Sequence, residues 1–230
     1  TKSKVLTYGL KNISDFNAKI VESTSESITL NFGTVDVTFN VIGDFNAYNI
    51  LAVYSLANIL KIDNDIILQK LSKLNNPSGR FEFLIGGNNQ IGIVDYAHTP
   101  DALENVLINI LKFKKNKKLI TVVGAGGDRD KSKRSKMGKI ASQYSDFVFF
   151  TSDNPRNENE NDIISDIVNG VVDDNYEIEI DRKIAIKMAF QKFKTNSIIL
   201  VAGKGHEKYQ IIGDKSLPHD DKEIIKELIL

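Results

Sequence analysis

Four apolar runs in this chain end abruptly in polar or glycine-rich motifs. The motifs are VDYAHTP at 94–100, VVGAGGDRDKSKR at 122–134, TSDNPRNE at 151–158 and VAGKGHEKYQ at 201–210. Ligands of open parallel sheets bind in the crevice outside the carboxyl ends of the strands. If the four runs are neighbouring parallel strands, the four motifs meet at one site, and the chain binds a small charged metabolite there.

Strand-like and helix-like segments alternate after residue 80. We expect strands at 81–85, 91–94, 119–123, 147–151, 177–180 and 198–202, and helices at 100–111, 133–144, 162–172, 182–193 and 221–230. Thr99 is a candidate N-cap for the helix that begins at Pro100, whose ring lacks an N–H. This alternation predicts an α/β fold with a mostly parallel sheet and right-handed crossovers.

The first part of the chain has another pattern. Short alternating runs at 18–21, 27–32 and 36–42 predict antiparallel strands, and two helices are expected to follow, one ending near residue 60 and one at 63–74. The segment NNPSG at 75–79 combines Pro and Gly with polar residues, which is typical of a linker. We therefore expect two domains, 1–77 and 78–230.

Composition excludes several classes of function. The 230 residues carry 30 basic and 30 acidic side chains, so no global field attracts nucleic acid or an anionic membrane. Cysteine is absent, which excludes disulfides and thiolate metal sites. No apolar run approaches the ~20 residues of a membrane span and no signal peptide is visible. We expect a cytoplasmic protein without membrane insertion, and a monomer.

The first two motifs allow a functional and a plain structural interpretation. Asp95 ends an apolar strand and can accept hydrogen bonds from ribose, but Asp95 and His98 could equally cap a tight turn. The glycines at 124–127 let backbone N–H groups approach a ligand, and Arg129 can form a fork with a carboxylate or phosphate. The phosphate-binding pattern G-x-x-x-x-G-K-[ST] occurs nowhere in the chain.

The last two motifs suit a zwitterionic ligand. Asp153 can hold an ammonium group and Arg156 a carboxylate, although Asn154 and Pro155 are also common in solvated turns. Glu207 can hold an amine. The three histidines have the spacing of no known ligand set, so we expect no metal site.

Other polar residues could contact a nucleotide between the two domains. Asn46 and Asn49 lie near the start of the first helix, where Asn is a routine cap, and Arg80 follows the linker.

Together these motifs resemble the Mur ligase family, and within it the branch that adds the third peptide residue of peptidoglycan, the UDP-N-acetylmuramoyl-tripeptide synthetases. The resemblance runs in consistent order from about residue 43 to the end of the chain. Residues 1–42 match no motif of the family and are placed by position alone, and PHDDK at 218–222 differs from the usual Asp-Asp-Arg pattern at Lys222. The matching segments are 45–51, 79–82, 94–103, 126–134, 153–156 and 201–209.

The resemblance implies an architecture and a reaction. Members have a UDP-substrate domain, a central ATPase domain and a C-terminal Rossmann-like domain, so residues 1–77 would end the central domain and 78–230 would form the last one. The reaction uses ATP and Mg²⁺ to join an amino acid to a UDP-linked muramoyl dipeptide, in cell-wall biogenesis and hence in cell shape and division. The P-loop, the magnesium ligands and the UDP-binding domain have no counterpart in these residues, so we expect this chain alone to be inactive.

The resemblance also implies roles for single residues. The incoming diamino acid would be held by Arg129, Asp153, Asn154, Pro155, Arg156, Gly203 and Glu207. ATP would lie near Asn46, Asn49, Arg80, Asp95 and His98.

Arg156 indicates which amino acid is added. The Asp-Asn-Pro-Arg form resembles members that add meso-diaminopimelate to UDP-N-acetylmuramoyl-L-alanyl-D-glutamate, because its distal carboxylate needs a cationic partner. Lanthionine would fit equally. The alternatives are an L-lysine-adding member, which tends to lack this arginine, a folylpolyglutamate synthetase, which lacks the motif, and a non-catalytic module that only binds an amino acid.

Overall fold

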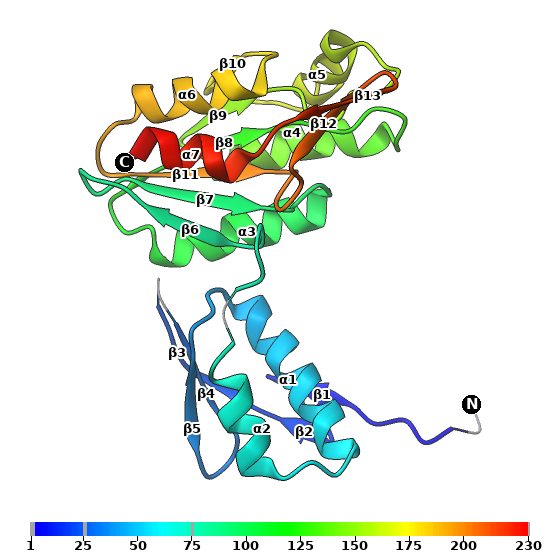
Figure 1. Ribbon diagram of the computed structural model, residues 1–230, viewed down its shortest axis with the longest axis vertical. Coiled ribbons are helices and arrows are strands. Elements are labelled where there is room, and N and C mark those ends of the chain that lie inside the picture. The colour runs from blue at the N-terminus through cyan, green and yellow to red at the C-terminus, as the bar shows by residue number, and fades with distance from the viewer. Residues whose placement is uncertain (1–2, 25–26, 75, 230) are drawn as a thin grey trace. The chain divides into compact units, whose positions relative to one another are not determined.

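The computed structural model describes residues 3–24, 27–74 and 76–229 (Figure 1). The chain divides into two compact units, Thr1–Asn76 and Pro77–Leu230. The division falls in the linker, where the sequence analysis placed a boundary between 77 and 78. Each unit has its own apolar core.

The N-terminal unit packs two helices on a small sheet. The strands β3, β4 and β5 pair antiparallel in that order, as the sequence predicts, and the short β1 and β2 form a parallel pair. Ile28 and Leu30 alternate with half-buried residues along β4 and join Phe39 in the core. The bounds are β1 (Tyr8–Gly9), β2 (Phe16–Asn17), β3 (Lys19–Ser23), β4 (Ile28–Asn31), β5 (Asp36–Phe39), α1 (Asp44–Ile59) and α2 (Asn64–Leu71).

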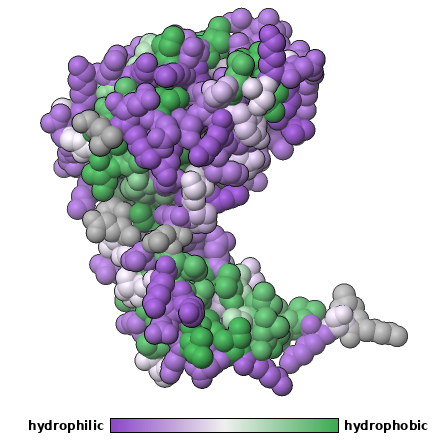
Figure 2. Space-filling model, in the orientation of Figure 1, coloured by the Kyte–Doolittle hydropathy of each residue, from purple (hydrophilic) through white to green (hydrophobic). Residues whose placement is uncertain are grey.

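Helices α1 and α2 leave apolar side chains uncovered. Figure 2 shows hydrophobic residues gathered on the surface of the N-terminal unit. Surfaces of this kind commonly mark a contact with another protein segment. The exposed aliphatic residues of α1, α2 and the turn between them are Val53, Leu56, Ile59, Leu60, Ile62 and Ile66.

The C-terminal unit is a six-stranded sheet with helices on both faces (Figure 1). The strand order is β10-β9-β8-β11-β7-β6, and only the β6–β7 pair is antiparallel. The strands of this sheet are β6 (Glu82–Ile85), β7 (Ile91–Asp95), β8 (Lys118–Val123), β9 (Phe147–Phe150), β10 (Tyr176–Ile178) and β11 (Ser197–Ala202). A separate antiparallel hairpin consists of β12 (Tyr209–Ile212) and β13 (Lys215–Pro218). The helices are α3 (Pro100–Phe113), α4 (Ser132–Tyr144), α5 (Glu160–Val168), α6 (Arg182–Lys192) and α7 (Asp221–Ile229).

Each face of the sheet is covered by a group of neighbouring helices. Helices α6 and α7 pack on the face that carries Ile120, Val122 and Val201. Helices α3, α4 and α5 contact one another in sequence and cover the other face. No helix in the described residues is both long enough and apolar enough to cross a bilayer.

Strand β11 occupies the centre of the sheet. All six of its residues are buried, and it pairs parallel with β7 on one side and β8 on the other. In this register Ala202, the last residue of β11, lies beside Asp95 of β7 and Val123 of β8. The carboxyl ends of these strands are therefore aligned, which confirms the predicted, mostly parallel α/β sheet.

Local signals are present in the sequence both for the start of α3 and for the β12–β13 hairpin. The Thr99 hydroxyl accepts a hydrogen bond from the Ala102 N–H at 3.3 Å and Pro100 is the first residue of α3, so the predicted cap is confirmed. The β12–β13 hairpin was missed. Its Gly213-Asp214 turn between short strands is an ordinary hairpin signal.

Gly138 of α4 lies where α4 packs closely against α5. A Cβ added at Gly138 would lie 2.0 Å from the carbonyl oxygen of Ile167 in α5. Alanine is the better helix former, but this overlap would force the helices apart, so Gly138→Ala is expected to lower the free energy of unfolding by about 1–3 kcal/mol. Urea denaturation measures the change.

Gly87 provides the matched control, because a Cβ there meets no heavy atom within 4 Å. Gly87→Ala is expected to change the free energy of unfolding by less than about 1 kcal/mol. Equal effects of the two substitutions would contradict the close packing of α4 on α5.

Candidate functional site

A cavity of about 420 Å³ lies at the carboxyl ends of the central strands. The loops after β7, β8, β9 and β11 all contribute to its wall, so the expectation that the four motifs meet at one site is confirmed. The lining residues are Tyr96, His98, Ala125, Gly126, Arg129, Asp130, Lys133, Arg134, Met137, Asp153, Asn154, Arg156, Gly203 and Glu207.

Asp153 lies against the loop that follows β11. Gly203 has φ +117°, and a Cβ there would lie 2.5 Å from Oδ2 of Asp153. Glycine adopts this positive φ without strain and has no side chain. Residue 203 therefore leaves room for the Asp153 carboxylate. The Gly203 N–H donates to the carbonyl oxygen of Asp95 at 3.0 Å, which ties this loop to the end of β7.

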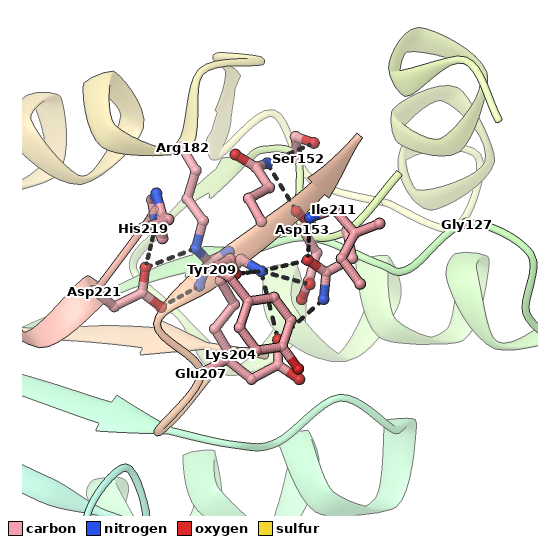
Figure 3. A network of polar contacts seen from close by, with 12 residues as sticks. Gly127, Ser152, Asp153, Arg182, Lys204, Glu207, Tyr209, Ile211, His219 and Asp221 are labelled. Carbon is pink, nitrogen blue, oxygen red and sulfur yellow. Dashed lines mark hydrogen bonds and ion pairs between the residues drawn. The ribbon is translucent and has the colours of Figure 1, made fainter. Parts of the chain in front are cut away.

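Asn154 connects two of the strand-end motifs. Its Oδ1 accepts hydrogen bonds from Nζ of Lys204 at 2.7 Å and from the Ile211 N–H at 2.9 Å. Its Nδ2 donates to Oε2 of Glu207 at 3.0 Å (Figure 3). Asn154 thus fixes a carboxylate of the cavity rather than merely forming a turn.

Arg156 is held by backbone on both sides. It has φ 53°, in the left-handed region that is uncommon for residues other than glycine. Its N–H donates to the Ile211 carbonyl oxygen, and its own carbonyl oxygen accepts from the Gly213 N–H. Its Nη1 donates to the Gly127 carbonyl oxygen at 2.8 Å, which places the guanidinium beside the glycine-rich loop.

A second buried charge cluster supports this edge of the sheet. Arg182 donates to both oxygens of Asp221, at 2.9 and 2.7 Å, and to the carbonyl oxygen of Ala202 (Figure 3). His219 Nε2 lies 2.8 Å from Oδ1 of Asp221. Despite burial, which opposes the charge, the Arg182 guanidinium keeps the pKa of the Asp221 carboxyl far below its usual range. The PHDDK segment therefore anchors α7 to the end of β11.

The glycine-rich loop is fixed by Arg134 of α4. Its Nη1 and Nη2 donate to the two oxygens of Glu158 at 3.0 and 2.8 Å, and Nη2 also donates to the Gly126 carbonyl oxygen. Asp166 accepts a further hydrogen bond at 2.9 Å. Hydrogen bonds from Arg134 and from the Asp128 N–H lower the pKa of Glu158 from 4.5 to about 2.

Aromatic and cationic groups surround Tyr96 at one side of the cavity. The Arg80 guanidinium lies 5.4 Å from the centre of its ring, and the rings of His98 and His206 are 4.6 and 5.2 Å away. Burial and the nearby charge of Glu207 raise the pKa of the Tyr96 hydroxyl.

Three residues predicted near a nucleotide form hydrogen bonds within their own unit. Asp95 is buried, and its carboxylate accepts from the Phe81 and Ala97 N–H groups at 2.8 and 2.7 Å. Burial raises its pKa, and these hydrogen bonds oppose that shift. Asn46 and Asn49 lie within α1, whose N-cap is Gly43, and Asn49 donates to Oδ1 of Asn46. A role with a nucleotide stays a prediction for all three.

The structure brings together most of the residues predicted to bind an amino acid. Pro155 does not line the cavity. Lys204 and Tyr96 lie within the strand-end motifs, but no role was predicted for them from the sequence. Gln210, which donates to the carbonyl oxygen of Asp153 at 2.8 Å, belongs to the missed hairpin. Within the described residues, no group of three His, Asp or Glu side chains is placed to hold a metal ion.

Comparison with known proteins agrees with this geometry. Residues 79–205 match the family described as "Mur ligase, glutamate ligase domain". The chain is 47% identical over its full length to the UDP-N-acetylmuramoyl-L-alanyl-D-glutamate--2,6-diaminopimelate ligase of Cytophaga hutchinsonii, covering 48% of that protein. The ligase of the same name from Bacillus cereus is 44% identical over the full chain, which covers 47% of it.

A solved structure with this ligase name gives the same result for the fold. It matches 98% of the chain with a TM-score of 0.67 and 32% identity, and the chain covers 47% of it. The chain thus spans about half the length of the relatives it matches.

The Arg134–Glu158 pair predicts how stability depends on pH. The pKa of Glu158 is 4.5 when unperturbed and about 2 in the folded chain, so its carboxylate stabilises the fold above pH 4.5. This contribution is lost as the pH falls towards 2. Glu158→Gln is therefore expected to lower Tm at pH 7, and the difference from the unsubstituted chain should shrink below pH 4.5 in thermal unfolding experiments.

The exposed Glu227 of α7 serves as the control for charge removal. Glu227→Gln is expected to leave Tm nearly unchanged at pH 7. A Glu158→Gln difference that stays constant from pH 7 to pH 2 would show that the ionised pair does not stabilise the loop.

Proposed function

Because the chain belongs to the Mur ligase family, we propose that it is the amino-acid-binding C-terminal part of a ligase in peptidoglycan synthesis. The ligase would use ATP to add meso-diaminopimelate to UDP-N-acetylmuramoyl-L-alanyl-D-glutamate. Family membership agrees with the resemblance that the motifs indicated. We assign the N-terminal unit to the end of the central ATPase domain and the C-terminal unit to the amino-acid-binding domain.

One observation carries the proposal for the substrate. Asp153, Glu207 and Arg156 line a single cavity, although they come from two different strand ends. Two carboxylates suit an ammonium group, and a guanidinium suits a carboxylate through paired hydrogen bonds. The distal end of meso-diaminopimelate carries both groups. Arg129, from a third strand end, supplies further positive charge, and Asn154 and Gly203 hold the carboxylates in place.

The proposed reaction forms an amide in two steps. The terminal phosphoryl group of ATP passes to the dipeptide carboxylate and ADP leaves. The amine of the diamino acid then attacks this acyl phosphate, and phosphate and a proton leave as the amide forms. The residues of this chain would hold the diamino acid so that its amine faces the acyl phosphate, and closure of the site would exclude water.

The nucleotide is proposed to lie near Arg80 and His98. His98 lines the cavity, and Arg80 lies over the ring of Tyr96, which also lines it. Asp95 would contribute to nucleotide binding by holding the loop that follows β7. Asn46 and Asn49 are proposed to contact ATP from the N-terminal unit.

The remaining proposals concern the reaction's setting. Magnesium would accompany ATP, but the described residues show no three-ligand cluster of His, Asp or Glu, so we assign it to no residue of this chain. A monomer in the cytoplasm, where ATP is available, completes the proposal.

Arg156→Ala tests which amino acid the site takes. Arg156 is proposed to pair with the distal carboxylate, and a charge-assisted pair of this kind contributes about 1.5–3 kcal/mol, so its loss should weaken binding of meso-diaminopimelate at least tenfold. L-Lysine lacks that carboxylate and should lose little. Calorimetric titration of the 230-residue chain with each amino acid measures both affinities.

The exposed Lys183 of α6 offers a matched removal of positive charge. Lys183→Ala should leave both affinities as they are. An unsubstituted chain that binds lysine as well as meso-diaminopimelate would favour a lysine-adding ligase, and one that prefers glutamate would favour a folylpolyglutamate synthetase. Binding of no amino acid would contradict the proposed site.

A further inference from the structure

Lys204 is a completely buried cation beside the candidate site. It follows Gly203 in the loop after β11, and none of its side chain is exposed. Its Nζ donates to Oδ1 of Asn154 at 2.7 Å and to the carbonyl oxygen of Tyr209 at 2.9 Å. Carboxylate oxygens of Asp153 and Glu207 lie 3.5 and 3.6 Å away (Figure 3). All four neighbours are acceptors, which matches an ammonium with three protons and no lone pair.

The first consequence concerns the orientation of Asn154. Both donors that reach its Oδ1, the Lys204 ammonium and the Ile211 N–H, require an oxygen at that position. The amide nitrogen must then point the other way, where it donates to Oε2 of Glu207 at 3.0 Å. Lys204 therefore sets the position of the Glu207 carboxylate through Asn154.

The second consequence concerns charge. Asp153 and Glu207 together bring two negative charges to one wall of the cavity, and Lys204 offsets one of them. The buried cations Arg182 and Arg134 are already matched by Asp221 and Glu158. One net negative charge remains on this wall, which balances the positive charge of one ammonium group.

We propose that Lys204 is a positioning residue that also sets the charge of the amine-binding wall, so that the site prefers an ammonium accompanied by a carboxylate over an ammonium alone. This inference rests on the proposed function and adds a second determinant of specificity to Arg156. Without Lys204 the wall would carry two negative charges. It would attract the singly charged side chain of lysine more strongly and would repel the carboxylate of meso-diaminopimelate.

A purely structural role makes a different prediction. Lys204 also binds the Tyr209 carbonyl oxygen and so connects the β12–β13 hairpin to the site. If this were its whole contribution, its removal would loosen the cavity and weaken both amino acids by a similar factor. The ratio of the two affinities separates the roles, because loosening does not change it.

Calorimetric titration of Lys204→Met with meso-diaminopimelate and L-lysine measures that ratio. The preference for meso-diaminopimelate should fall by about tenfold, because one buried charge is left unbalanced. In the double variant Lys204→Met/Glu207→Gln the wall again carries one negative charge, and the preference should return towards that of the unsubstituted chain. The double variant also serves if Lys204→Met does not fold, since its wall has the same net charge as that of the unsubstituted chain.

Lys114 provides a matched lysine at the other end of the sheet. It pairs with Asp146 at 2.8 Å next to the start of β8, and Lys114→Met should leave the preference unchanged. If the unsubstituted chain prefers meso-diaminopimelate and the ratio of the two affinities is unchanged in the Lys204 variants, this inference alone is overturned. An unsubstituted chain that does not prefer meso-diaminopimelate would overturn the proposed function, and this inference with it.

Discussion

The pairing of β11 between β7 and β8 is the constraint on which the site depends. Parallel strands in this register end side by side, so the residues that follow each of them enter the same space. The three strands are almost entirely buried and apolar, and they carry no chemistry themselves. Their function is to hold Tyr96, Ala125 and Gly203 at fixed separations, so that loops from distant parts of the sequence can share one cavity.

Buried cations then fix these loops to one another. Among the described residues Arg134, Arg182 and Lys204 are fully buried, and each reaches a carboxylate and a backbone carbonyl oxygen. A buried charge is costly unless it is paired and hydrogen-bonded, and such groups tolerate few alternative arrangements. The three clusters therefore give rigidity to segments that would otherwise be exposed loops. A cavity lined by residues from loops thereby gains a fixed geometry.

The sequence predicted the sheet well because its signals are local. Apolar periodicity, the Thr99 cap and glycine at strand ends reflect single elements, and they indicated both the alternating fold and the edge where the motifs meet. Lys204 was overlooked because a lysine between two glycines looks like a solvated turn residue. Its burial depends on the β12–β13 hairpin covering it, and on Asn154, fifty residues earlier in the chain. For Asp95 the sequence left a nucleotide contact and support of a tight turn as alternatives. In the structure its carboxylate accepts from the Phe81 and Ala97 N–H groups.

The β12–β13 hairpin forms a two-stranded sheet of its own, yet its backbone holds Arg156 on both sides and its Gln210 contacts the loop of Asp153. A Cβ added at Gly213, in the turn of the hairpin, would meet no heavy atom within 4 Å. The turn therefore faces open space, whereas a change in the register of the hairpin would shift Arg156 and the loop of Asp153, which line the cavity. In evolutionary terms, the shape of the cavity could change through this surface ribbon while the residues that line the cavity stay the same.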